Sequence, residues 1–367
     1  MKKGLDGSLN KLYVFGAHSR ARTTAKYLIY HDNSVELLAF LIDNDEDNED
    51  EIGGIPVIDI RRGCKLDTTA SVYIGTRGAN FESATKHLEA LGFSNIYPID
   101  VRRDAELRMN YFKKRFKDEG RPLFLIDEMS ASGSADNVNV CIFEVRSAYD
   151  KALTKDIYVR ASYEKSIQVG AALTHVVISE CEYRDDEGEN ISDTNRQLCE
   201  ITALYWMWKH STFDIVGLVH YRRHFLLPDD WVERMTGNDV DIILPLPLYI
   251  EPSVEGNYRF RHVSSDWDHM LAFMEEHYKE QMDSIHKCFD DTYYYPCNMF
   301  VMKKNVFEEY CNWLFPILFY VMEKVGSRDD VYQNRYPAFM AERLLTLFCY
   351  INRDKYKIVS TDKSFLE

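Results

Sequence analysis

Two adjacent arginines follow a short apolar segment in the middle of the chain. Residues 215–219 are too few for a helix and predict a buried strand, and His220, Tyr221, Arg222 and Arg223 follow it directly. In open α/β sheets, ligands bind beyond the carboxyl ends of the strands. A guanidinium group holds phosphate oxygens through paired hydrogen bonds that lysine cannot copy. These residues therefore predict an anion site, with a phosphorylated or nucleotide substrate as the first hypothesis.

The arginine pair also has a simpler interpretation. Arginines after a strand are often solvated loop charges or partners of nearby carboxylates, and the chain has 59 Asp and Glu residues against 44 Lys and Arg. Short motifs carry a high false-positive rate. The surrounding pattern must decide between the two interpretations.

The segment before this strand predicts a capped helix. Thr194, with Gln197 three residues later, matches a capping box, and apolar residues follow at helical spacing at Leu198, Ile201, Leu204, Tyr205 and Trp208. Asn190 and Asn195 occupy the loop before the helix. Their amides either bind a uracil or ribose or act only as turn and cap residues, and the sequence leaves both interpretations open.

Composition predicts a globular protein without nucleic acid or an anionic membrane as its main partner. The chain is 46% hydrophobic and 13% aromatic, and its formal net charge is -15. Its 8 cysteines form no Cys-x-x-Cys pair, which indicates a reducing compartment rather than a disulfide framework. The longest apolar stretch is about half as long as a membrane-spanning helix. We expect a cytoplasmic protein with at most peripheral contact at the inner face of the membrane.

The first hundred residues alternate between strand and helix patterns. Predicted strands lie at residues 12–15, 35–42, 57–60, 71–74 and 95–99, and predicted helices at 21–31 and 81–91. This order predicts the parallel sheet of a Rossmann-like domain. The turn at residues 16–21 lacks two glycines of the dinucleotide-binding fingerprint, and His18 would crowd a pyrophosphate. The turn therefore does not identify a ligand.

A polar, Gly- and Ser-containing stretch at residues 131–137 indicates a boundary between two domains. We predict a Rossmann-like accessory domain at residues 1–120, a linker at 121–137 and a second α/β domain at 138–367. The second domain begins with a predicted strand at residues 138–145.

Six blocks of the second domain occur in one order: residues 167–172, 190–192, 199–206, 217–223, 298–300 and 341–345. Together they resemble the family of bacterial capsular and exopolysaccharide glycosyltransferases catalogued as domain of unknown function 4422. The resemblance covers roughly residues 138–350. It implies a GT-A-like α/β glycosyltransferase domain, in which a nucleotide-binding sheet is joined to an acceptor-binding half.

The chain departs from this family after the first strand of the second domain. Family members usually carry Thr-His-Lys there, whereas this chain has Val145, Arg146 and Ser147. We expect Arg146 to supply a replacement charge. The donor-binding residues predicted in this way are His220, Tyr221, Arg222, Arg223, Asn190, Asn195 and Arg146.

Sugar transfer from a nucleotide sugar needs stabilisation of the charge that develops on the leaving diphosphate. Many GT-A enzymes hold a divalent metal with an Asp-x-Asp motif at the carboxyl end of a strand. Here Asp239 and Asp241 precede the predicted strand 242–245, at the wrong end of the sheet. We predict that Arg222 and Arg223 do part or all of this work and that replacing either by Ala abolishes transfer. No metal ligand is predicted, although a Mn or Mg cation remains compatible with the chemistry.

An inverting transferase needs a general base, whereas a retaining one can dispense with it. The candidates for this base are Glu342, near the start of an apolar helix, and Asp266 or Asp268 near His262. Glu342 is the predicted catalytic carboxylate, and an ion pair with Arg343 or Arg335 is its competing interpretation. We expect Glu200 to anchor Arg222 or Arg223. The predicted acceptor-binding residues are Asn298, His262 and Asp268.

The leading hypothesis is a hexosyltransferase of capsular or exopolysaccharide biosynthesis. Its donor would be a UDP-hexose, with a galactose form among the candidates, and its acceptor a lipid-linked or free oligosaccharide. One alternative is a nucleotide-sugar-modifying enzyme whose chemistry lies in the N-terminal domain. The other is a non-catalytic protein that binds polysaccharide precursors. A homo-oligomer is compatible with the sequence.

Overall fold

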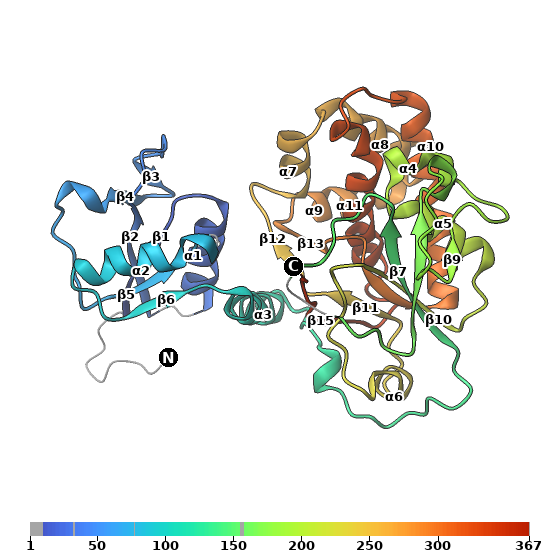
Figure 1. The fold of residues 1–367 in the computed structure, drawn as a ribbon, viewed down its shortest axis with the longest axis horizontal. Helices are drawn as coiled ribbons and strands as arrows, with labels where there is room; N and C mark the ends of the chain where they lie inside the picture. The colour runs from blue at the N-terminus through green and yellow to red at the C-terminus, as the bar shows by residue number, and fades with distance from the viewer. Residues whose placement is uncertain (1–9, 32–33, 77, 155–157, 367) are drawn as a thin grey trace. The chain divides into compact units, whose positions relative to one another are not determined.

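The computed structural model describes residues 10–31, 34–76, 78–154 and 158–366. Its internal contacts divide the chain into two compact units, Met1–Leu123 and Phe124–Glu367. The division falls at the start of the predicted linker. Both units are α/β with mainly parallel sheets, so the predicted fold class is confirmed (Figure 1).

The first unit contains a sheet with the strand order β3-β4-β2-β1-β5-β6. All neighbouring strands are parallel except β3 and β4. The strands are β1 (Asn10–Phe15), β2 (Val35–Ile42), β3 (Glu51–Ile52), β4 (Ile55–Asp59), β5 (Ser71–Ile74) and β6 (Ile96–Pro98). The helices are α1 (Ser19–His31), α2 (Phe81–Ala90) and α3 (Val101–Asp118), with short 3-10 segments η1 (Ile60–Arg62) and η2 (Gly78–Asn80).

Alternation along β1 explains why both faces of this sheet are covered. Leu12 and Val14 pack in one apolar cluster with residues of α1, whereas Tyr13 and Phe15 pack in another with residues of α2. At the end of β5, a Cβ on Gly75 would lie 2.7 Å from the Cα of Ala21. Glycine therefore permits the close approach of α1 to the sheet.

The second unit is built on a sheet with the order β15-β11-β14-β10-β7-β8-β9. Strand β14 runs antiparallel to β10 and β11, and the other pairs are parallel. The strands are β7 (Val140–Ser147), β8 (Glu164–Val169), β9 (Tyr183–Arg184), β10 (Ile215–His220), β11 (Ile242–Pro245), β14 (Phe300–Lys303) and β15 (Ile358–Thr361). A separate antiparallel pair is formed by β12 (Leu248–Tyr249) and β13 (Tyr293–Tyr294).

Helices cover both faces of this sheet. The helices are α4 (Asn195–Leu198), α5 (Ile201–His210), α6 (Trp231–Gly237), α7 (Val254–Arg261), α8 (Ser264–His277), α9 (Met282–Phe289), α10 (Lys304–Val325) and α11 (Tyr336–Ile351). The 3-10 segments are η3 (Ile126–Glu128), η4 (Ala171–Leu173), η5 (Ser192–Thr194), η6 (Lys279–Gln281) and η7 (Gln333–Arg335). Trp231 and Met235 of α6 pack with Ile142, Ile215 and Ile243 on one face. Helices α5 and α10 pack together and contact strands β8, β10 and β14.

The predicted continuous helix over residues 194–208 is wrong at one point. The chain leaves the helical conformation at Cys199, where φ is 48° and ψ is -124°, and α5 starts at Ile201. Asn195 Nδ2 donates to the Cys199 carbonyl at 2.7 Å. The capping box is also absent, because the Thr194 hydroxyl donates to the Ile191 carbonyl at 2.6 Å and caps nothing. The apolar pattern is therefore divided between α4 and α5, with a local hydrogen bond from Asn195 at the break.

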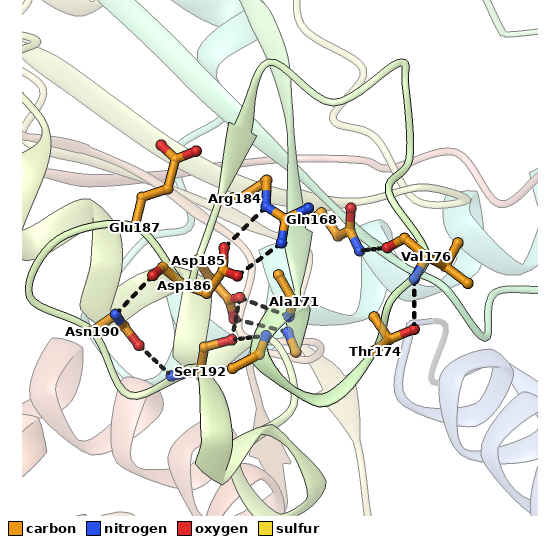
Figure 2. Close-up of polar contacts among 12 residues, drawn as sticks. Gln168, Ala171, Thr174, Val176, Arg184, Asp185, Asp186, Glu187, Asn190 and Ser192 are labelled. Carbon is orange, nitrogen blue, oxygen red and sulfur yellow. Dashed lines mark hydrogen bonds and ion pairs between the residues drawn. The ribbon is translucent and has the colours of Figure 1, made fainter.

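One buried carboxylate connects the loop after β8 to η5 and to the start of α5 in the second unit. Asp185 is fully buried and accepts hydrogen bonds from the Gly170 amide (2.9 Å), the Ala171 amide (3.0 Å), the Ser192 hydroxyl (2.5 Å) and the Thr202 hydroxyl (2.6 Å). Figure 2 shows Asp185 between the Ala171 and Ser192 segments. Asp185 therefore ties the loop after β8 to η5 and to the start of α5.

No helix in the described part of the chain is both long enough and apolar enough to cross a membrane.

We expect Asp185→Asn to lower the free energy of unfolding by about 2–4 kcal/mol, because the amide replaces a charged acceptor and leaves buried donors unpaired. Urea unfolding followed by circular dichroism measures this change. Asp186→Asn is the matched control. Asp186 pairs with Arg184 at 2.8 Å on the partly exposed side of the same loop, and such a pair contributes about 0–1 kcal/mol. Equal losses in the two variants would contradict the role assigned to Asp185.

Candidate functional site

A cavity of about 540 Å³ lies at the carboxyl ends of β7, β8 and β10. Its volume falls in the range of small-molecule sites. Ligands of open α/β folds bind at this edge of the sheet, beyond the carboxyl ends of the strands. The lining residues are Val145, Ser147, Ala148, Tyr149, Asp150, Val169, Gly170, Leu173, Thr174, Asn195, Arg196, Cys199, Glu200, His220, Tyr221, Arg223, Cys297, Arg335 and Glu342.

The cavity brings together only some of the residues predicted from sequence. Asn195, His220, Tyr221, Arg223 and Glu342 line it, although they come from α4, β10 and its following turn, and α11. The remaining predicted residues do not line it; they are Asn190, Arg146, Arg222, Asn298, His262 and Asp268.

A tight turn separates the two neighbouring arginines. The His220 amide donates to the Arg223 carbonyl at 3.1 Å, and the Arg223 amide donates to the His220 carbonyl at 2.9 Å. After this reversal Arg223 lines the cavity and Arg222 does not. The Arg222 guanidinium lies 4.6 Å from the centre of the Tyr221 ring, and its Nε is buried without a partner among the described residues. The two arginines are therefore not equivalent.

Arginines without a carboxylate partner gather around the cavity. Most arginines of the second unit form ion pairs: Arg146, Arg160, Arg184, Arg234, Arg259, Arg328 and Arg343. Within the described part of the chain, Arg196, Arg223 and Arg335 have no carboxylate partner, and all three line the cavity. Elsewhere in the described second unit, Arg222, Arg261 and Arg353 also lack one. In a chain of net charge -15, such a cluster indicates a site for an anion.

Arg335 is a cavity residue that sequence reasoning considered only as an ion-pair partner of Glu342. Its Nε donates to the Cys199 sulfur at 3.0 Å, and its guanidinium lies 5.1 Å from the centre of the Phe339 ring. These contacts hold the side chain without neutralising its charge. Arg196 was missed as well, because its position in η5–α4 gives no sequence signal for a cavity.

A left-handed turn connects three polar side chains of the cavity. Cys297 and Asn298 have φ values of 72° and 50°. The Cys297 amide donates to Glu342 Oε1 at 2.7 Å, and the Cys297 carbonyl accepts from His220 Nε2 at 2.7 Å. Asn298 Nδ2 donates to Glu200 Oε1 at 2.8 Å. This turn therefore sets the positions of His220, Glu200 and Glu342 together.

The protonation of His220 and Glu342 follows from burial. Burial lowers the pKa of His220, against the opposing effects of Glu200 and the Cys297 carbonyl, so we expect a neutral imidazole that donates through Nε2. Burial also raises the pKa of Glu342, while its contacts with Arg343 and the Cys297 amide act in the opposite direction. The competing interpretation of Glu342 is present in the structure, since Oε2 lies 2.9 Å from Arg343 Nη1.

Three of the predicted ligand-binding residues have other partners. Arg146 Nη2 lies 2.9 Å from Glu144 Oε1. The Glu144 side chain is fully buried and needs a counter-charge. The Asn190 amide donates to the carbonyls of the Asp186–Gly188 turn, and its oxygen accepts from the Ser192 amide (Figure 2). Asp268 pairs with Arg259 at 2.7 Å. We therefore leave Arg146, Asn190 and Asp268 out of the site.

Asn298 and His262 are buried rather than lining the cavity. Asn298 is 1% exposed and donates to Glu200 and to the Ala338 carbonyl, so it acts from behind the cavity wall. His262 is 8% exposed and stacks on Phe339 at 4.3 Å. Glu200 also differs from its prediction, because its partner is Asn298 and not Arg222 or Arg223.

The Asp239-x-Asp241 motif lies at the amino end of β11, as predicted from its place before the strand. Asp241 accepts from Lys303 Nζ and from the Lys357 amide, both at 2.9 Å. Because β14 is antiparallel to both β10 and β11, β11 runs in the same direction as β10, and its amino end lies at the edge opposite to the cavity. Among the described residues, no group of three or more His, Cys, Asp or Glu side chains is arranged to hold a metal ion.

A family model described as domain of unknown function DUF4422 matches residues 152–353, the region that contains most of the cavity. No curated protein matches the chain. The apo structure of the WbbM bifunctional glycosyltransferase is 26% identical with a TM-score of 0.53, covering 62% of this chain and 45% of that chain. This chain thus spans less than half the length of that protein.

A more distant solved structure is core-mannan synthase A (CmsA/Ktr4) from Aspergillus fumigatus in its Mn/GDP form. It is 11% identical with a TM-score of 0.32, covering 66% of this chain and 79% of that chain. This similarity is too weak to inform the site.

The burial of His262 makes stability depend on pH. Burial, together with Arg343 and Arg261, lowers the pKa of His262 from 6.5 to about 4. Between these values the unfolded chain binds a proton that the folded protein does not, so this residue lowers the free energy of unfolding as pH falls from 6.5 to 4. The full effect is about 3 kcal/mol.

We expect His262→Phe, which keeps the stacking surface, to remove this part of the pH dependence. Denaturant unfolding at several pH values measures the difference between the variant and the wild type. His286→Phe at an exposed position should leave the wild-type slope unchanged. Parallel curves for wild type and His262→Phe would contradict the assignment.

Proposed function

Because the chain belongs to the DUF4422 family over residues 152–353, we propose that it is a glycosyltransferase whose nucleotide-sugar donor binds in the cavity of the second unit. The observation that carries this proposal is the gathering of Arg196, Arg223 and Arg335 around that cavity without carboxylate partners among the described residues. The likeness to the WbbM structure, at 26% identity, supports the same class of reaction.

The arginines suit a diphosphate leaving group. As the bond to the sugar breaks, negative charge develops on the departing phosphate oxygen, and fixed positive groups lower the barrier. Arg223 follows β10 and Arg335 belongs to η7, so the two guanidinium groups reach the cavity from different segments. We propose that they do part or all of the work that a Mn or Mg cation does in many glycosyltransferases.

The donor we propose is a UDP-hexose, with UDP-galactose as the first candidate. Asn195 lines the same cavity and retains its Oδ1 as an acceptor, while its Nδ2 is bound to Cys199. Gly170 has a φ of 63°, and a Cβ there would lie 2.6 Å from Asn195 Oδ1. The glycine therefore permits the close approach of the Asn195 side chain to the loop after β8.

The acceptor we propose is a lipid-linked or free oligosaccharide of capsular or exopolysaccharide biosynthesis. The support for this step is the sequence resemblance to enzymes of surface polysaccharide assembly. A non-catalytic precursor-binding protein is the alternative that an activity measurement separates from this proposal.

We expect Arg223→Ala to weaken UDP binding about 10- to 100-fold, because a hydrogen bond to a charged group contributes about 1.5–3 kcal/mol and each 1.4 kcal/mol is tenfold. Isothermal titration calorimetry with UDP measures the dissociation constant. Arg222→Ala should have a smaller effect, since Arg222 does not line the cavity. Release of UDP from UDP-galactose should fall in the same order.

Arg353→Ala is the matched control for this measurement. It removes an arginine that also has no carboxylate partner within the described residues but lies outside the cavity. Equal affinity of Arg223→Ala and Arg353→Ala for UDP would remove the anion site from the cavity. Binding of UDP without any release from a UDP-sugar would favour the non-catalytic alternative.

A further inference from the structure

Carboxylates also line the cavity, and their oxygen atoms have different partners. Glu200 lies at the junction between α4 and α5, Glu342 lies in α11, and Asp150 lies in the loop after β7. A transferase that uses a base needs a carboxylate oxygen that is free to accept a proton and can be reached by the acceptor hydroxyl. The hydrogen bonds of each carboxylate therefore decide which of them can act.

Both oxygens of Glu342 are occupied by protein groups. Oε1 accepts from the Cys297 amide at 2.7 Å, and Oε2 pairs with Arg343 at 2.9 Å. Arg343 is 3% exposed, so removing its counter-charge would leave a buried cation. A proton arriving at Glu342 would break this pair. The hydrogen bonds thus give Glu342 a positioning role rather than a basic one.

Glu200 has one oxygen held and one oxygen open. Oε1 accepts from Asn298 Nδ2 at 2.8 Å, and the Asn298 amide is itself held by the Ala338 carbonyl. Oε2 accepts no hydrogen bond from the described residues, and it is not a buried atom. Since Glu200 lines the cavity, Oε2 is the oxygen that a substrate hydroxyl can reach.

The position of Glu200 also separates it from Asp150. Glu200 follows Cys199, whose sulfur accepts a hydrogen bond from Arg335. The negative charge of Glu200 interacts with Glu342 and with Arg335. Asp150 is exposed, and one of its oxygens accepts from the Ser147 amide at 2.8 Å. Glu200 therefore lies near Arg335, one of the cations proposed for the diphosphate, whereas Asp150 is exposed.

We propose that Glu200 is the general base of the transfer, an inference that rests on the function proposed above. The acceptor O–H bond breaks and its proton moves to Glu200 Oε2, while the acceptor oxygen forms a bond to the anomeric carbon of the donor sugar. The bond from that carbon to the phosphate oxygen breaks, and its electron pair leaves on the diphosphate. A single displacement of this kind inverts the configuration at the anomeric carbon.

The experiment compares Glu200→Gln, Glu342→Gln and wild type, with UDP-galactose and UDP-glucose as donors and water as the acceptor. We expect Glu200→Gln to release UDP about 10²- to 10⁴-fold more slowly than the wild type, as befits the loss of a general base. Its dissociation constant for UDP, measured by calorimetry, should stay within about twofold of the wild-type value. This corresponds to a change of less than about 0.5 kcal/mol in the binding free energy. Glu342→Gln should lose less activity than Glu200→Gln.

The control is Glu275→Gln, which makes the same change at an exposed position of α8 outside the cavity. Circular dichroism of each variant reports whether it is folded. A stereochemical measurement is independent of the variants. Proton NMR of the first hexose released from an α-linked UDP-hexose by the wild type should show the β anomer.

Two results would overturn the assignment of Glu200. One is a Glu200→Gln variant that releases UDP at the wild-type rate, and the other is first release of the α anomer. Failure of the proposed function gives a different result, because wild-type protein would then release no UDP from either donor.

Discussion

The antiparallel direction of β14 is the constraint on which the cavity depends. In an all-parallel sheet, the start of a strand lies at the edge opposite to the ligand site. Because β14 is reversed, with Phe300 paired to Leu218, the residues before it lie beside the residues that follow β10. The Cys297–Asn298 turn thereby reaches His220, Glu200 and Glu342. Left-handed backbone at two non-glycine residues costs about 1–2 kcal/mol each, and hydrogen bonds to the two carboxylates offset this at about 1.5–3 kcal/mol each.

Regular elements could be predicted where the apolar pattern and its boundaries agree. Strands 35–42, 71–74 and 242–245 have the predicted ends, because each is an apolar run bounded by polar or turn-forming residues. The carboxyl edge of β10 and the wrong-end position of Asp241 followed from the same reasoning. The break at Cys199 could not be predicted, because the surrounding residues keep a helical pattern. Its contacts come from Asn195 within the same pattern and from Arg335, which is distant in sequence.

The site residues could be predicted only where residues that are adjacent in sequence also line the same cavity. The sequence does not distinguish Arg222 from Arg223. The hydrogen-bonded turn from His220 to Arg223 places Arg223, and not Arg222, in the lining of the cavity. The pairing of Arg146 with Glu144 had a signal that was overlooked, since residues i and i+2 of a strand share a face. For Arg335 no such signal exists, because its hydrogen-bond acceptor, Cys199, lies in a segment that only the tertiary fold brings near.

The different partners of Glu200 and Glu342 are consistent with the proposed chemistry. A base and a leaving diphosphate are both anionic, so an arginine that pairs with the base is not available to the diphosphate. Glu200 is held by the neutral amide of Asn298 and leaves Arg223 and Arg335 without a carboxylate partner among the described residues. Glu342 takes its counter-charge from Arg343, which does not line the cavity. Neither carboxylate forms an ion pair with Arg196, Arg223 or Arg335 among the described residues, so these guanidinium groups remain available to the substrate in a chain of net charge -15.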